Sequence, residues 1–414
     1  MGYGSQALAL KYLGVEFEHW KICEWAVKSI QAYKDIHFTD KKIEGININK
    51  LKEQDIKDYL FKKGISVNYN EPMTKEQINR LSYDNAKKII ENIFITHNLV
   101  NIQKVKGKDL EIVDTDRYDY ILTYSFPCQD LSLAGKGKGM SDTSTRSGML
   151  WEVERILTEC NELGTMPQIL LMENVPQVHG ADNLEDFNKW KLRLEELGYK
   201  NYFQDLIATD YGIPQTRNRC FMVSILGDYS YTFPQPIPLK LKLKDMLEDN
   251  VDEKYFLSDK MKQYIFSEDD KYKVNKNNLK LNRDIACSKT TREGWTRADT
   301  SDYICEFGNK SLQETLEQNN IDDTCYIDTY NKRIDKEKSG TITTGVSFRN
   351  NTFLADSDLR IRKLTPKECF RLMGVKDEDF EKCAKNQSDS SLYHLAGDSI
   401  VVNVLMAIFK ELIQ

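Results

Sequence analysis

An uninterrupted apolar run, Gln168-Ile-Leu-Leu-Met172, restricts the fold of this chain more than any other feature, and it ends at Glu173-Asn174. Such a run is typical of a strand buried on both faces, which occurs mainly in parallel sheets covered by helices. Two more β-rich runs, 118–124 and 220–225, and three helix candidates flank it, at 6–13, 150–163 and 183–197. This alternation predicts an α/β fold with a doubly wound, mostly parallel, Rossmann-like sheet.

Cys128 follows the first of these predicted strands, between Pro127 and Gln129. In doubly wound sheets ligands bind at the carboxyl ends of strands, and positive charge nearby favours the thiolate form of a cysteine. The next residues, 132–140, contain three glycines and two lysines, which predicts a mobile cationic lid. Cys128 is therefore a candidate nucleophile. The alternative is a structural cysteine buried in the core.

Two other strand ends carry charged side chains. Glu173 ends the apolar run, where partial desolvation should raise its proton affinity and make it a candidate general acid. Arg217 and Arg219 precede the run 220–225 and, two residues apart on a strand, would point the same way and hold a phosphate or a carbonyl oxygen. Singly, each could be an ordinary surface ion-pair residue, but three strand ends presenting Cys, Glu and Arg indicate one site.

The start of the chain has a weaker signal. Gly2-Tyr-Gly4 precedes a helix candidate, Glu24 follows about 20 residues later, and Trp25 is next to it. In nucleotide-binding sheets a glycine turn cradles the ligand and an acid at this distance binds a ribose hydroxyl. A lone GxG is common in turns, so this pattern alone decides little.

Composition argues against a membrane-spanning or a secreted protein. The chain has no apolar run near the roughly 18 residues that span a bilayer, and no charged and apolar leader pattern at its start. Its nine cysteines include no CxxC pair and its five histidines are dispersed, so we predict reduced thiols, a cytoplasmic location and no metal site.

The chain changes character after three prolines within 233–238. We predict one domain, 1–233 completed by 357–414, and a smaller, irregular insert at 234–356. Charge is segregated in and beside the insert, with a net +6 at 271–297, −7 at 298–328 and +5 at 331–371, against −6 for the whole chain. Taken alone, such runs are most often solvated faces.

Several motifs occur in a specific order: Ser125-Phe-Pro-Cys-Gln129, Glu173-Asn-Val175, Gln215-x-Arg217-x-Arg219, Arg362-Lys-Leu-Thr-Pro-Lys-Glu368 and Gly397-Asp-Ser-Ile400. Along nearly the whole chain they resemble the cytosine-C5 DNA methyltransferase family, most closely its bacterial type II branch that contains small CpG enzymes. The resemblance implies a catalytic set of Cys128, Glu173, Arg217 and Arg219. It implies S-adenosyl-L-methionine as the cofactor, with these binding residues: Gly2, Tyr3, Gly4, Ser5, Gln6, Glu24, Trp25, Asn101, Ile102, Pro127, Asp398, Ser399 and Ile400.

The resemblance also implies double-stranded DNA as the partner and 234–356 as a target-recognition domain. The DNA contacts it implies are Gln129, Ser132, Lys136, Lys138, Arg146, Thr341 and Thr343. Cys128 would add to cytosine C6, Glu173 would protonate N3 and Arg219 would hold O2, so that C5 can take the methyl group. A stacked base is out of reach, so it must be flipped out. We expect a monomer; a cognate restriction endonuclease acting on the same site is a further partner compatible with this family.

Three departures bear on this interpretation. Asn101 stands where the family usually has Asp, Asp398 stands where Asn is usual, and the family's first strand is absent because Met1 already lies inside the glycine motif. We therefore expect a chain that begins downstream of its true start, to which about 8 to 12 upstream residues would add stability and cofactor affinity. Two rival functions stay open: an RNA cytosine methyltransferase of the same fold, against which the large insert argues, and a catalytically silent DNA-binding protein.

Overall fold

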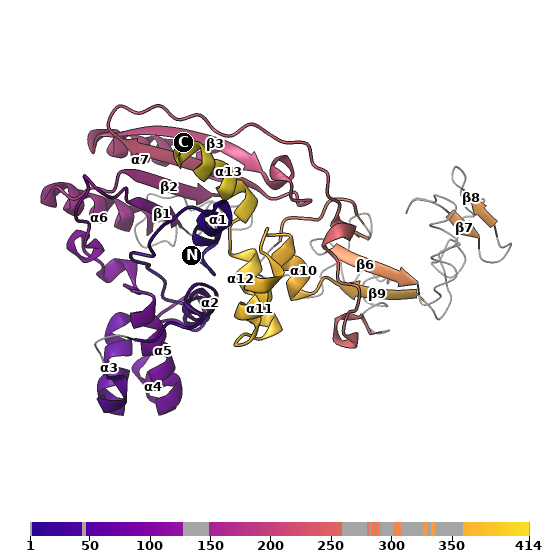
Figure 1. Cartoon of the computed structure of the whole chain (residues 1–414), viewed down its shortest axis with the longest axis horizontal. Coiled ribbons are helices and arrows are strands. Elements are labelled where there is room, and N and C mark those ends of the chain that lie inside the picture. Colours follow the sequence, from indigo (N-terminus) through magenta and orange to yellow (C-terminus); the bar gives the residue numbers. More distant parts are fainter. Residues whose placement is uncertain are drawn as a thin grey trace.

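A computed structural model gives the structure of the protein, and its elements are labelled in Figure 1. It describes residues 2–43, 47–126, 149–258, 280–281, 283–289, 291, 302–307, 326–328, 333–335 and 359–413.

The central sheet has four strands in the order β1-β2-β4-β3. Their bounds are Ile121–Ser125 for β1, Ile169–Asn174 for β2, Tyr199–Ile207 for β3 and Asn218–Leu226 for β4. β1 and β2 are parallel, whereas β4 runs antiparallel to both of its neighbours, β2 and β3. Three of the four strands therefore point the same way, which confirms the predicted α/β fold. The sequence did not predict β3, nor that β4 is reversed.

Both faces of this sheet are buried, as the apolar run at 168–172 predicted. Leu170 and Met172 pack with Trp190 in a core under two helices, α6 (Leu150–Leu163) and α7 (Leu184–Glu196). Leu171 faces the other way, into a core with residues of α1 (Ser5–Leu13) and α13 (Val402–Ile413). α1 and α13 lie side by side over the sheet in Figure 1, so the two ends of the chain are packed together.

The C-terminal part continues this second core with three short helices. They are α10 (Pro366–Arg371), α11 (Asp377–Ala384) and α12 (Asp389–Gly397). Thr365 begins α10 with a capping box, because its hydroxyl accepts from the Glu368 amide while the Glu368 carboxylate accepts from the Thr365 amide. No single described helix is long and apolar enough to cross a bilayer; α12 and α13 reach the required length only together, across a 41° bend.

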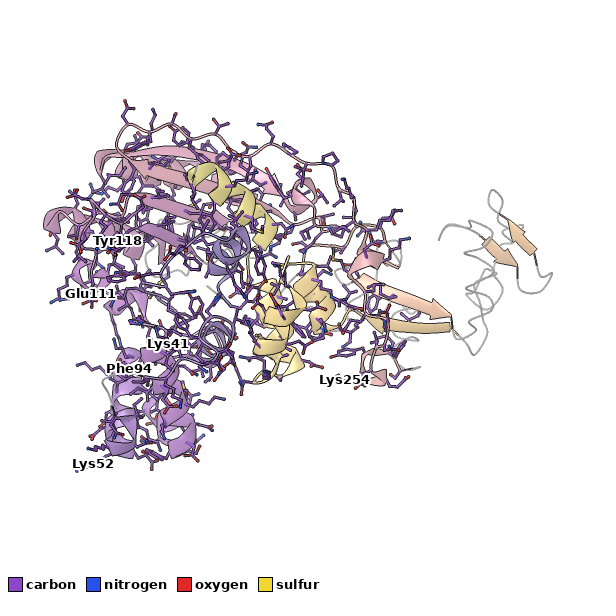
Figure 2. All side chains as sticks on the ribbon, in the orientation of Figure 1. Lys41, Lys52, Phe94, Glu111, Tyr118 and Lys254 are labelled. Carbon is purple, nitrogen blue, oxygen red and sulfur yellow. The ribbon has the colours of Figure 1, made fainter. Side chains whose placement is uncertain are left out.

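A helical lobe between the first helices and β1 was not predicted. After α2 (Val27–His37) come α3 (Glu53–Lys63), α4 (Lys75–Asn79) and α5 (Tyr83–Ile95), which project from the sheet in Figure 1. They have a core of their own that includes Ile56, Leu60, Ile78 and Ile90. Lys52 lies at the outer end of this lobe (Figure 2).

Three strands of a smaller sheet join the predicted insert to the C-terminal part. Their order is β5-β6-β9, with bounds Lys280–Leu281, Asp302–Phe307 and Leu359–Lys363. β6 pairs antiparallel with β9, which lies just after the predicted boundary at 357. A separate hairpin is formed by β7 (Tyr326–Asp328) and β8 (Arg333–Asp335).

Candidate active site

The strand ends that carry the predicted catalytic residues meet at one edge of the sheet. Ser125 of β1 is the backbone neighbour of Glu173 in β2, and Glu173 is in turn paired with Phe221 of β4. Because β4 is reversed, it begins at the edge where β1 and β2 end. The chain after Ser125 leads to Cys128, so the nucleophile motif starts beside the predicted acid. Strand order and direction thus bring the three motifs together.

Glu173 and Arg219 form an ion pair at this edge. Their Oε1 and Nε atoms are 3.1 Å apart, and the side chains are 11% and 20% exposed, so solvent reaches both only partly. Arg219 also donates from Nη1 to its neighbour's carbonyl, Asn218 O, at 2.7 Å. A carboxyl group and a guanidinium held together in this way can contact adjacent ring nitrogen and carbonyl positions of one planar base.

Arg217 has other partners. Its side chain is buried, and the guanidinium donates to three backbone carbonyls, those of Lys289 (2.8 Å), Gly397 (3.1 Å) and Ser399 (2.8 Å). Burial lowers the pKa of this guanidinium, and Arg219 lowers it further. The two arginines do not form one clamp on a common ligand in this structure: Arg217 joins three segments of the chain, and Arg219 faces Glu173.

Gln215 strengthens the same junction. It is fully buried, donates from Nε2 to Leu372 O at 2.6 Å and accepts from the Lys289 amide at 2.9 Å. The side chain of Lys289 is itself buried in an ion pair with Asp302 of β6 at 2.7 Å. The Gln215-x-Arg217 pair before β4 thus fixes how the smaller sheet lies against the edge of the central sheet that carries Glu173.

Asn174 is a site residue that the sequence analysis did not single out. It is 3% exposed, and its Nδ2 donates to Phe126 O at 3.1 Å while its Oδ1 accepts from the Val175 amide at 2.8 Å. Phe126 stands two residues before Cys128. Asn174 therefore fixes the start of the nucleophile segment against the end of β2, and the signal for it was its place beside Glu173 in the acid motif.

The predicted cofactor residues at the two chain ends are in contact. Gly2 and Gly4 have φ of 56° and 83°, in the region that favours glycine, and a Cβ on Gly2 would lie 2.5 Å from Ser399 Oγ. The Ser5 hydroxyl accepts from the Ile400 amide at 3.3 Å. Tyr3 is buried and stacks on Phe370 with ring centroids 4.9 Å apart, and Gln6 lies in the first turn of α1.

Glu24 and Asn101 lie on two neighbouring segments. The Glu24 amide donates to Asn98 Oδ1 at 3.0 Å, and its carboxylate accepts from the Ala26 amide at 2.9 Å. Trp25 packs against the core of the helical lobe. The Asn101 side chain is buried, and its Oδ1 accepts from the Gln103 amide at 3.0 Å, so one acceptor position of the expected adenine contact is used within the chain.

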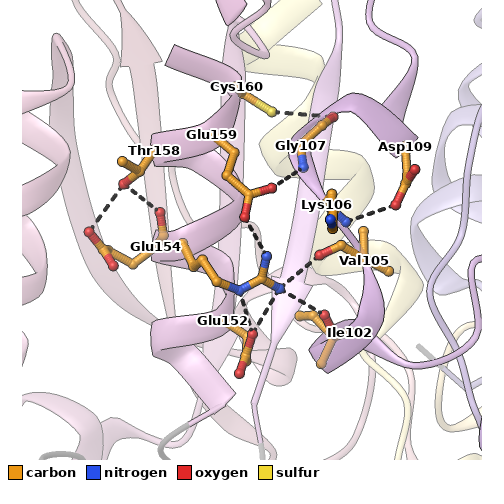
Figure 3. Close-up of polar contacts among 11 residues, drawn as sticks. Ile102, Val105, Lys106, Gly107, Asp109, Glu152, Glu154, Thr158, Glu159 and Cys160 are labelled. Atoms are coloured by element: carbon orange, nitrogen blue, oxygen red, sulfur yellow. Dashed lines mark hydrogen bonds and ion pairs between the residues drawn. The ribbon is translucent and has the colours of Figure 1, made fainter. Parts of the chain in front are cut away.

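Arg155 of α6 holds the segment that follows Asn101, and several of its partners are labelled in Figure 3. Its Nη2 donates to Ile102 O at 3.2 Å and to Val105 O at 2.8 Å, and its guanidinium also pairs with Glu152 and Glu159. Glu159 accepts from the Gly107 amide at 2.7 Å. The helix after the nucleophile loop is thereby tied to the predicted adenine-binding segment.

Known proteins with similar sequences identify the family. Residues 64–414 match the C-5 cytosine-specific DNA methylase family. The type II methyltransferase M2.ScrFI of Lactococcus lactis subsp. cremoris is 33% identical, over 100% of this chain and 97% of that protein. The chain belongs to the C-5 cytosine-specific DNA methylase family.

Two further comparisons concern a second relative of this C-5 cytosine methylase and its fold. The orphan methyltransferase M.SssI of Spiroplasma monobiae is 32% identical over 99% of this chain and 95% of its own length. The fold is similar to the crystal structure of Schizosaccharomyces pombe Dnmt2, with a TM-score of 0.57 and 15% identity over 99% of this chain and 94% of that one. The resemblance drawn from the motifs is confirmed: this methylase acts on C5 of cytosine in DNA and uses S-adenosylmethionine.

The described residues of this C-5 cytosine methylase fit S-adenosylmethionine. Burial lowers the pKa of His394. The carboxylates of Asp398 and Glu24, which come from opposite ends of the sequence, partly offset this by raising it. Two carboxylates beside one ring suit a ligand with ribose hydroxyls and positive groups. Nine predicted residues lie outside the described part of the chain: Pro127, Cys128, Gln129, Ser132, Lys136, Lys138, Arg146, Thr341 and Thr343.

Proposed function

We propose that this C-5 cytosine methylase acts on a specific sequence in double-stranded DNA, with Cys128 as the nucleophile, Glu173 as the acid and Arg219 as the ligand of the cytosine carbonyl. The observation that carries the proposal is the Glu173–Arg219 pair, 3.1 Å apart at the strand edge from which the segment of Cys128 departs. Such a pair places a carboxyl group and a hydrogen-bond donor beside two neighbouring positions of one base.

The chemistry of cytosine explains why these residues are needed. C5 is a weak nucleophile, so the Cys128 thiolate forms a bond to C6 while N3 takes the proton of Glu173 and Arg219 donates to O2. When bound, S-adenosylmethionine supplies a methyl group activated by its positive sulfur. Loss of the C5 proton to water, departure of the Cys128 thiolate and return of the N3 proton to the Glu173 carboxylate then restore the ring. A general acid in such a step contributes about 10²- to 10⁴-fold in rate.

The base must leave the duplex before this reaction, because a stacked cytosine exposes neither face of C6 to a thiolate. We propose that the segment after Cys128 closes behind the flipped nucleotide. We also propose that Lys136, Lys138 and the basic runs 271–297 and 331–371 contact phosphates. The insert 234–356 is proposed as the target-recognition domain. The antiparallel pairing of β6, in the insert, with β9, in the C-terminal part, supports a fixed attachment of that domain to the catalytic part.

The biological setting is also a proposal. One similar protein is named a type II methyltransferase and another an orphan methyltransferase, so a cognate restriction endonuclease is compatible with the family and not required by it. We propose a cytoplasmic monomer in a restriction-modification setting.

Methyl transfer from labelled S-adenosylmethionine tests this function. We expect label on duplex DNA and none on transfer RNA. Glu173→Gln should lower the rate by about 10²-fold or more and leave DNA binding intact. Label on transfer RNA alone would establish the RNA rival. Binding of DNA with no transfer to either substrate would support the silent DNA-binding rival.

A further inference from the structure

A cluster of three side chains that can bind metal lies beside the strand edge that carries Glu173. His179 ends η5 (Pro176–His179), the short helix that follows the acid motif, while Asp205 lies in β3 and Cys220 in β4. One imidazole nitrogen, one carboxylate oxygen and the sulfur all lie within 4.8 Å of one another. The three side chains come from three separate elements, so the tertiary fold brings them together.

Strand pairing explains two of the three positions. Asp205 and Cys220 are directly paired residues of the antiparallel strands β3 and β4. Residues paired in this way place their side chains on the same face of a sheet, with Cβ atoms about 5 Å apart. Cys220 is fully buried in the core under α6 and α7, whereas the Asp205 side chain is 33% exposed. The thiol therefore closes the inner side of the cluster, and the carboxylate reaches solvent.

His179 completes the cluster from the third element. Its Nε2 lies 2.9 Å from Asp205 Oδ1, and its side chain is 29% exposed. The imidazole ring packs against Phe187 and Phe203, whose ring centroids are 6.1 Å and 5.6 Å from its own, and these contacts hold it over β3. Solvent reaches both His179 and Asp205, so an ion can approach the buried sulfur from their side.

The charges around Cys220 favour a cation at this position. Burial raises the pKa of the Cys220 thiol, and the carboxylates of Asp205 and Glu173 raise it further. The protein alone therefore keeps this thiol protonated. A divalent cation reverses that preference, because a thiol that coordinates it loses its proton.

The ligand types identify the ion. A thiolate, an imidazole and a carboxylate together suit Zn²⁺, whereas Mg²⁺ and Ca²⁺ prefer oxygen ligands alone. A tetrahedral zinc ion with ligands at about 2.0–2.3 Å holds them roughly 3.5 Å apart, so these three atoms need only small movements to bind it.

We propose that His179, Asp205 and Cys220 bind Zn²⁺, with a water molecule in the fourth position. The neutral imidazole coordinates through Nε2 with its proton on Nδ1, and the thiol proton is released to solvent. The ion then ties η5, directly after the acid motif, to β3 and β4. This proposal departs from the prediction of no metal site, which considered only neighbours in the sequence, and it does not depend on the proposed catalytic roles.

Metal binding to the full chain carrying Cys128→Ser tests the proposal without catalysis. This background removes the thiol of the proposed nucleophile, which can also bind metal. Equilibrium dialysis should give about one Zn²⁺ per chain, and excess Mg²⁺ should not displace it. Co²⁺ in place of Zn²⁺ should give a near-ultraviolet band from sulfur-to-metal charge transfer, and Cys220→Ala should abolish that band. His179→Gln and Asp205→Asn should each raise the Kd for Zn²⁺ by at least about 10-fold.

Cys160→Ala is the matched control. Cys160 is a second buried thiol of the same core, and its Sγ donates to Gly107 O at 3.7 Å. This variant should keep both the band and the Kd of the background protein. A band that persists in Cys220→Ala, an unchanged Kd in both His179→Gln and Asp205→Asn, or a background protein that binds no Zn²⁺ would each overturn the proposal. If Cys220→Ala does not fold, the other two variants decide, because they change partly exposed side chains to ones of similar shape.

Discussion

At the scale of single residues, Asn174 connects the acid motif to the nucleophile motif. Its side chain spans from the end of β2 to the Phe126 carbonyl; the hydrogen bond to Phe126 is buried and the one from the Val175 amide is partly buried. Asn174→Ala leaves a carbonyl and an amide without partners, which should lower the free energy of unfolding by about 1–3 kcal/mol. It should also slow single-turnover methyl transfer by at least about 10-fold, because Phe126, two residues before Cys128 in the sequence, is no longer bonded to the end of β2.

Asn201→Ala is the control for this change. Asn201 also donates to a backbone carbonyl, that of Lys191, and accepts from the Ser224 hydroxyl. It lies near the start of β3, at the end of the sheet opposite to Glu173 and Asn174. We expect a similar loss of stability in urea unfolding and an unchanged rate constant for transfer. Equal rate losses in both variants would show that Asn174 acts only through stability.

The sequence could predict Glu173 and Arg219 as site residues because each directly adjoins a recognisable strand. It could not predict the partners of Arg217, since these carbonyls come from segments 72 to 182 residues away. The same holds for His179, Asp205 and Cys220, whose ligand-type atoms come within 4.8 Å of one another although the histidines and cysteines are dispersed in the sequence. Contacts of this kind depend on strand pairing, which local patterns do not specify.

At the scale of elements, the glycine turn before α1 packs on α2. A Cβ on Gly4 would lie 2.5 Å from the Tyr33 ring and 2.7 Å from His37 Nε2, at a φ of 83°. Gly4→Ala combines backbone strain with overlap and should cost about 2–5 kcal/mol of stability. Gly14→Ala is the matched variant, since Gly14 ends α1 at a φ of 71° with no atom within 4 Å of its Cβ position. It should cost only about 1 kcal/mol in the same unfolding measurement; equal losses would contradict the packing described.

The α1–α2 contact also predicts a pH dependence. Burial lowers the pKa of His37 from 6.5 to about 3, with a further contribution from His19, and burial lowers that of His19 to about 4. Below about pH 6.5 the unfolded chain therefore binds more protons than the folded one. Stability present above that pH should be lost as the pH falls toward 4, by on the order of 1 kcal/mol per pH unit for each group.

His37→Gln tests this origin of the pH effect. The His37 ring donates from Nε2 to Tyr3 O at 2.9 Å, and a glutamine amide can make that bond without titrating. Urea unfolding at pH 7 and pH 5 should show a smaller difference for the variant than for the wild type. An unchanged difference would mean that other groups produce the effect.

Element prediction from sequence succeeded where hydrophobic periodicity is strong. The helix predicted at 150–163 matches α6, and the strand run predicted at 168–172 overlaps β2, which begins one residue later and extends to Asn174. β3 was missed because its exposed residues interrupt the apolar pattern. The helical lobe was missed because each of its helices contributes only a few residues to the lobe's separate core. Local propensity does not show that such helices pack on one another.

At the scale of the whole molecule, backbone contacts tie the insert to the segment before β4. The Thr216 amide donates to Ala286 O at 2.9 Å, the Ala286 amide donates to Pro214 O at 2.8 Å, and the Lys289 amide donates to Gln215 Oε1 at 2.9 Å. Exchanging 234–356 for the segment of a relative, while keeping 283–289 and 302–307, should move the methylated sequence and preserve stability. Bisulfite sequencing of a methylated plasmid measures the site. A methylated sequence that stays with the residues outside the exchange would contradict the proposed recognition domain.

Trapping of the protein on DNA tests the central claim most directly. A duplex with 5-fluorocytosine at the target position lets the Cys128 thiolate add to C6, but fluorine at C5 cannot leave as a proton does, so the thiolate stays bonded. With S-adenosylmethionine present, we predict a covalent adduct that mass spectrometry of the digested protein locates at Cys128, and no adduct with Cys128→Ser. An adduct at any other of the nine cysteines, or none at all with a duplex that the protein methylates, would contradict the account.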